Sequence, residues 1–184
     1  MLEDFTMNRY LPGRIVLIAL AIFLIPMIII PLLYPHGFIS ELDGSIGVID
    51  HASLWDELDP FSGTLYAIGD YLCHQQMNRS FIINGSEVAL CIRDFSVLCG
   101  MLIGLILTDN KLKIFRHYNI RLLFISLILS STTFFEWWII KSYVIDSSVV
   151  RAIMGIFSGI GLAILLQHAI YYEFLFIDQN LHDD

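Results

Sequence analysis

Residues 70–104, DYLCHQQMNRSFIINGSEVALCIRDFSVLCGMLIG, bring reactive side chains next to a long apolar run. An acid, a thiol and an imidazole come first, in Asp70, Cys73 and His74. A polar turn follows, and a second thiol and a second acid, Cys91 and Asp94, then stand at the start of the apolar run. The stretch therefore predicts a chemical site at one end of a membrane helix.

The composition of the whole chain is that of a membrane protein. Its 184 residues suit one domain, which we take as residues 1–184, and 57% of them are hydrophobic. The net charge of −8 argues against a nucleic-acid partner, because a nucleic acid is itself an anion. The lipid bilayer is the partner that this composition predicts.

We predict an all-α integral membrane protein with four transmembrane helices and one domain. A helix needs roughly 20 apolar residues to cross a hydrocarbon core of ~30 Å. Runs that approach this length lie at about 14–34, 88–107, 122–143 and 149–172. Residues 35–87 form a polar loop, for which we expect short amphipathic helices against the membrane surface, with an ordinary packed loop as the alternative.

The distribution of basic residues predicts the orientation. The loop 108–121 contains Lys111, Lys113, Arg116 and Arg121, whereas the only cation of the loop 35–87 is Arg79. Because cytoplasmic loops are enriched in Lys and Arg, we expect the loop 108–121 and both termini in the cytoplasm. The chain is then a multi-pass protein of the cell membrane, and its loop 35–87 lies outside.

Glycines at helical spacing predict close contacts between spans. Gly100 and Gly104 form a small-xxx-small pair, and Gly155, Gly159 and Gly161 give the last span a second smooth face.

Several ionisable residues are expected at one depth near the outer surface. If residues 64–76 are helical, Asp70, Cys73 and His74 share one helix face. Glu136 falls in the outer third of the third span, and Arg151 begins the fourth span. Charges inside a bilayer rarely face lipid, so Glu136 and Arg151 are expected to point inward and pair, with Asp94 beside Arg93 or Arg151 as another pairing.

Three interpretations of the thiols stay open. The first is a site for zinc or another divalent metal, with Cys73, His74, Cys91 and Asp94 as ligands and Asp70 as a further candidate. The second is a disulfide or redox pair between Cys73 and Cys91. The third is a pair of plain buried thiols, because free cysteine is among the most buried residue types.

The function therefore stays open between three classes. A metal site is either structural or catalytic; if it is catalytic, Glu136 or Asp94 serves as base and Arg151 as anchor for an anion. A thiol–disulfide module would use Cys73 and Cys91. A non-catalytic accessory subunit would pack its glycine faces against a larger membrane complex, and a homo-oligomer is a further expectation.

The motif CHQ…RSF…G…C-x-R-D resembles the signature of an uncharacterised prokaryotic membrane-protein family, a domain of unknown function. The residues on this pattern are Cys73, His74, Gln75, Arg79, Ser80, Phe81, Gly85, Cys91, Arg93, Asp94 and Gly104, with Glu136, Arg151, Gly155 and Gly159 on a weaker second half. The resemblance covers roughly residues 60–165. Asp94 stands where the more familiar form of the family has a third cysteine, and Glu136 stands where it commonly has Asp-Gly. The resemblance implies a membrane protein and sharpens the site, but it implies no activity.

Overall fold

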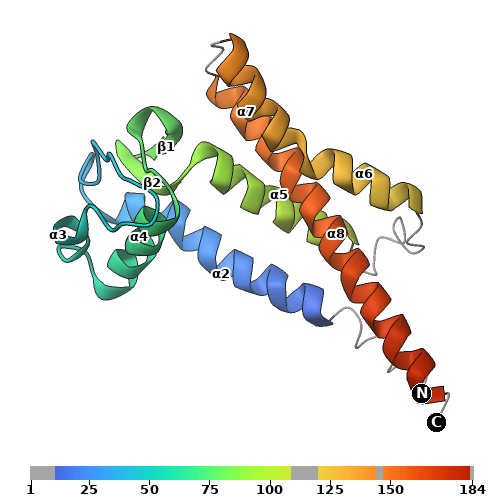
Figure 1. Ribbon diagram of the computed structural model, residues 1–184. Helices are drawn as coiled ribbons and strands as arrows, with labels where there is room; N and C mark the ends of the chain where they lie inside the picture. Colours follow the sequence, from blue (N-terminus) through green and yellow to red (C-terminus); the bar gives the residue numbers. More distant parts are fainter. Residues whose placement is uncertain (1–10, 109–119, 144–146, 183–184) are drawn as a thin grey trace.

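The computed structural model describes residues 11–108, 120–143 and 147–182, and most of them are helical (Figure 1). Two strands form a small antiparallel sheet between the helices. The elements in chain order are α2 (Leu11–Leu33), α3 (Ala52–Trp55), α4 (Pro60–Leu72), the 3-10 helix η1 (Met77–Arg79), β1 (Ser80–Ile83), β2 (Ser86–Cys91), α5 (Ile92–Thr108), α6 (Ile120–Ser130), α7 (Thr132–Tyr143) and α8 (Ser148–His182).

Among the described residues, three helical stretches are long and apolar enough to cross a membrane. They cover Leu11–Leu33, Ile120–Trp138 and Ser148–Ile170, which lie close to the first, third and fourth predicted spans. Large apolar side chains on these helices stay exposed, as expected of surfaces that face lipid, for example Ile22, Ile128 and Val149. Helices able to span a membrane thus lie at three of the four predicted spans.

The predicted second span, 88–107, needs a correction. Residues 88–91 belong to β2, and helix α5 begins only at Ile92. Its 17 described residues rise about 26 Å, which is less than the ~30 Å of a hydrocarbon core. The run Val88–Leu90 is apolar because β2 is buried on both faces, and periodicity alone does not distinguish a short buried strand from a helix. Four spans are therefore not confirmed, and the sheet corrects the all-α prediction.

Helices α6 and α7 follow one another with a break at Ser131. The hydroxyl groups around the break donate to carbonyls of the preceding turn: Ser130 to Ser126 at 2.7 Å, Ser131 to Ile128 at 2.7 Å and Thr132 to Leu129 at 2.7 Å. Such back-bonding competes with the helical hydrogen bonds and often bends a helix. The third predicted span, 122–143, therefore consists of two helices.

The α5–α8 contact is the most extensive between any two described helices, and it depends on glycine (Figure 1). A Cβ atom at Gly100 would collide with the carbonyl of Ile156, and one at Gly159 would collide with the carbonyl of Val97. The backbones of α5 and α8 thus touch directly, as the glycine spacing predicts.

Residues 35–91, which we call the hairpin unit, surround one end of α2 (Figure 1). The unit contains the two short helices α3 and α4, as the sequence predicts for this loop. Its core includes Trp55, Tyr66, Val88 and, from α2, Met27, all at most 4% exposed.

The turn of the hairpin fastens this unit to α2. Asn84 and Gly85 have φ values of 52° and 72°, which suits a two-residue turn between paired strands. The Asn84 amide donates to the carbonyls of Pro31 and Tyr34, both at 3.1 Å. The last carbonyls of a helix have no partner within it, so Asn84 satisfies an end that would otherwise be unpaired.

Candidate functional site

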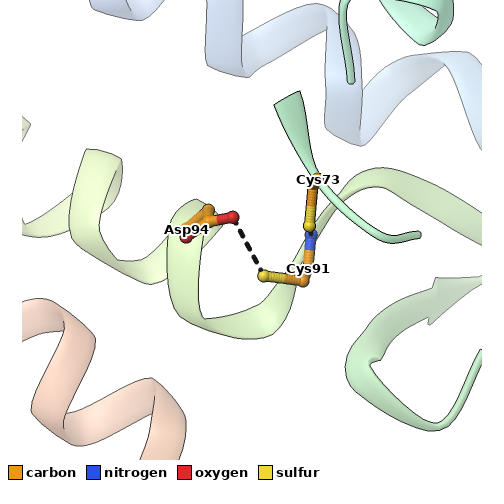
Figure 2. A group of neighbouring side chains, drawn as sticks. All are labelled: Cys73, Cys91 and Asp94. Carbon is orange, nitrogen blue, oxygen red and sulfur yellow. Dashed lines mark hydrogen bonds between the residues drawn. The ribbon is translucent and has the colours of Figure 1, made fainter. Parts of the chain in front are cut away.

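The site lies where the hairpin unit meets the membrane helices, and three elements supply one side chain each (Figure 2). Cys73 caps the end of α4 in an extended conformation, with φ −138° and ψ 151°. Cys91 is the last residue of β2, and Asp94 stands in the first turn of α5. Because β2 leads directly into α5, Cys91 and Asp94 share one rigid junction.

The potential ligand atoms of Cys73, Cys91 and Asp94 all lie within 4.8 Å of one another. The Cys91 thiol donates to Oδ2 of Asp94 at 3.1 Å (Figure 2). The Cys91 backbone N–H donates to Sγ of Cys73 at 3.3 Å. Two sulfurs and a carboxylate oxygen at such spacing match the ligand types that zinc takes in proteins.

The two thiols differ in acidity. Interaction with the Cys91 side chain lowers the pKa of Cys73, and the Cys91 amide supports the same thiolate. The pKa of Cys91 is raised, first by its contact with Cys73 and then by burial and the nearby Asp94 carboxylate. Cys73 is therefore the thiol that ionises first, with Cys91 as a hydrogen-bond donor.

A cavity of about 160 Å³ opens beside these three residues. Three arginines contribute to its wall: Arg79 from η1, Arg93 from α5 and Arg151 from α8. The complete lining is Ile46, Cys73, His74, Gln76, Arg79, Cys91, Arg93, Asp94 and Arg151. Positive charge thus dominates the space into which the thiols and Asp94 face.

Glu136 of α7 is held by two of the arginines. Its side chain is fully buried, and Nε of Arg93 lies 2.9 Å from its Oε2. Nε of Arg151 lies 3.8 Å from its Oε1. The predicted pairing of Glu136 with Arg151 is therefore present, but Arg93 is the nearer partner.

Two of the predicted candidates lie apart from the group of three. Helix α4 ends at Leu72, so Asp70, Cys73 and His74 do not share a helix face. Asp70 is fully buried in the hairpin unit, where it accepts from Nε1 of Trp55 at 2.9 Å and from the backbone of His51 at 3.0 Å. His74 lines the cavity, but its Nδ1 lies 3.1 Å from the Gly44 carbonyl.

Two residues of the site have roles that the sequence reasoning missed. In the sequence, Arg79 is the cation of its loop and a residue of the family motif, and the structure shows that it also lines the cavity. Gln75 is fully buried, and its amide donates to the Ala89 carbonyl of β2 at 2.9 Å. This bond fixes the segment after Cys73 against β2, next to Cys91. The sequence signal for this role of Gln75 was its position directly after Cys73 and His74 in the CHQ motif.

Comparison with known proteins gives a family match that includes this site. Residues 73–165 match the model of a family described as "Predicted membrane protein (DUF2085)", a range that begins at Cys73 and includes Cys91, Asp94, Glu136 and Arg151. A curated relative, "Uncharacterized protein MJ1492" of Methanocaldococcus jannaschii, is 41% identical over 66 residues, which are 35% of this chain and 42% of the relative. The aligned part thus spans less than half of that relative, and no solved structure matches the chain. Since the family model covers half of the sequence, the chain belongs to this family of predicted membrane proteins.

Proposed function

We propose that the protein binds a divalent metal ion, zinc or an ion of similar preference, through Cys73, Cys91 and Asp94. The observation that carries this proposal is the convergence of their ligand atoms from three different elements to within 4.8 Å. Zn–S bonds of about 2.3 Å and Zn–O bonds of about 2.0–2.2 Å require only small side-chain adjustments from such a starting distance.

Three protein ligands leave a fourth position in tetrahedral zinc sites, and catalytic sites fill that position with water or substrate. If Cys73, Cys91 and Asp94 held a metal ion, the arginine-lined cavity beside them would offer room for water or substrate, and His74 in its wall would be a further candidate ligand. A bound zinc ion lowers the pKa of a coordinated water. Asp94 serves as ligand and Arg151 as anion anchor, while Glu136, held by Arg93 and Arg151, keeps the two guanidinium groups in place.

We propose that this site faces the outside of the cell. The support is the distribution of cations, since the basic loop 108–121 is separated from the hairpin unit by α5. This orientation requires α5 to cross the bilayer as a fourth span, and both termini are then cytoplasmic.

A thiol–disulfide module is the second candidate, favoured by the direct contact between the two cysteines. The Cys91 amide lies 3.3 Å from Cys73 Sγ, and the lowered pKa of Cys73 marks it as the attacking thiolate. Both cysteines carry free thiols in the structure.

The test is the metal content per chain, measured by elemental mass spectrometry on protein purified without oxygen and without chelator. We expect about one zinc or iron per chain in the wild type and its loss in both Cys73→Ser and Cys91→Ser. Cys99→Ser is the matched control, because Cys99 lies on α5 outside the group and its loss should leave the metal bound. A wild type without metal would overturn the proposal. The disulfide would then be tested by whether Cys73 and Cys91 resist alkylation until they are reduced.

A further inference from the structure

A second cavity adjoins the first. It is an apolar groove of about 660 Å³ between α2 and α5, with Leu72 and Leu90 of the hairpin unit at its border. The remaining lining residues are Ile15, Val16, Ala19, Leu20, Phe23, Asp94, Val97 and Leu98. Asp94 lines both cavities, so the apolar groove and the arginine-lined cavity meet at the candidate metal ligand.

The two cavities differ in chemistry. The smaller one presents Arg79, Arg93 and Arg151, of which two share the single carboxylate of Glu136. A bound metal ion would also neutralise the negative charge of Asp94. The cavity would then favour an anion. The groove offers one ionisable group, Asp94, and otherwise only apolar side chains.

We propose that the chain binds a lipid with an anionic headgroup, whose phosphate lies among the three arginines and whose acyl chain lies in the groove between α2 and α5. The proposal rests on the proposed function in one respect, since it supplies the substrate class for the metal site. The headgroup of such a lipid would lie next to Cys73, Cys91 and Asp94.

A lipid fits better than a soluble anion because the apolar groove and the arginine-lined cavity share Asp94 in their linings. Along α2 the groove extends from Ile15 to Phe23, which is about 12 Å of helix rise. Its volume lies within the ~300–1,000 Å³ of typical ligand sites. Ile15 is 58% exposed on a helix that is long and apolar enough to cross a membrane, so the groove is open to the lipid phase.

The test is native mass spectrometry of the full chain in neutral detergent, titrated with phosphatidylglycerol, with phosphatidylcholine and with water-soluble glycerol phosphate. We expect one phosphatidylglycerol per chain, bound about tenfold more tightly than phosphatidylcholine, a ratio that one charge-assisted hydrogen bond can supply. Equal affinity for the two lipids would overturn the proposal. Glycerol phosphate binding as tightly as the lipid would also overturn it, because the groove would then contribute nothing.

Matched variants separate the two parts of the site. Arg79→Gln should lose the preference for the anionic lipid and Arg79→Lys should restore most of it. Ala19→Trp should fill the groove and weaken both lipids, whereas Ile18→Trp, which changes an exposed neighbour outside the lining, should not. Wild-type binding in both Arg79→Gln and Ala19→Trp contradicts the proposed site.

Metal content is measured on the same samples. Neither Arg79 nor Ala19 is a proposed ligand, so their variants should keep the metal. Bound metal without lipid selectivity overturns the lipid proposal alone, and lipid selectivity without metal overturns the metal proposal alone.

Discussion

Glu136 is the residue on which the charge balance of the site depends. Its carboxylate is fully buried and has Arg93 at 2.9 Å and Arg151 at 3.8 Å. Glu136→Gln removes the carboxylate charge that Arg93 and Arg151 share, and removal of one partner from a buried pair typically costs about 3–5 kcal/mol. We expect a lower thermal midpoint in detergent.

A double-mutant cycle with Arg93→Gln distinguishes the ion pair from general packing. If Glu136 acts through Arg93, the double variant should lose clearly less stability than the sum of the single variants. Additive losses would contradict the pairing.

We predict that the buried carboxyl group of Glu87 makes the stability of the hairpin unit depend on pH. Burial raises its pKa above the usual 4.5, although the Leu42 amide donates to Oε1 at 3.0 Å. The folded state therefore holds this proton more tightly than the unfolded chain does. The contribution of Glu87 to stability is present below pH 4.5 and is lost as the pH rises through the folded pKa.

Glu87→Gln keeps an acceptor for Leu42 and removes the titration. Thermal midpoints measured between pH 4.5 and pH 8 should fall less steeply in this variant than in the wild type. Parallel curves for the two proteins would show that Glu87 does not contribute.

At the residue scale, the sequence predicts part of the site. Cys91 and Asp94 are three apart at the start of an apolar run, and this local spacing was enough to pair them. Cys73 joins them because the chain returns from α4 to β2. The expected common depth near the outer surface suggested this contact, but the hydrophobic periodicity did not. Asp70 and His74 were grouped with Cys73 on the assumption of a continuous helix, which the extended backbone of Cys73 ends.

At the scale of elements, the α5–α8 contact leaves no room for a side chain at its glycine positions. A methyl group at Gly159 meets the Val97 carbonyl, and overpacking of this kind costs typically ~1–3 kcal/mol, occasionally more. The helix propensity gained by replacing glycine with alanine is only about 1 kcal/mol. Gly159→Ala should therefore lower the thermal midpoint.

The matched control lies on the same helix. Ile153 is 47% exposed, so Ile153→Ala should change the midpoint little. Equal stability of Gly159→Ala and wild type would mean that α5 and α8 do not depend on backbone contact.

The helices were easier to predict from the sequence than the hairpin. Long apolar runs identify α2 and the start of α8 closely, but α8 continues to His182, beyond the predicted end at 172. The dipeptide Asn84-Gly85 is a strong hairpin signal, but the apolar residues after it were assigned to a span. The break at Ser131 was missed because hydroxyl back-bonding alters hydrogen bonds without changing hydropathy.

At the scale of the whole molecule, orientation is the property to test. Asp43 of the hairpin unit has a side chain that is 96% exposed, and Ile120 at the start of α6 is 62% exposed. In spheroplasts, a membrane-impermeant maleimide should label Asp43→Cys, whereas Ile120→Cys should require permeabilisation. Peptide mapping locates the label despite the native cysteines. The reverse pattern would place the site in the cytoplasm.

The junction of β2 and α5 also gives the site a mechanical property. Asp94 moves with α5, whereas Cys73 moves with the hairpin unit, which Asn84 fastens to α2. The 17 described residues of α5 rise only about 26 Å. In a thicker or thinner bilayer, this helix would need a different tilt to match the thickness of the hydrocarbon core. We therefore expect a change in bilayer thickness to act on the contact between the Cys91 amide and Cys73, next to the junction that Cys91 and Asp94 share.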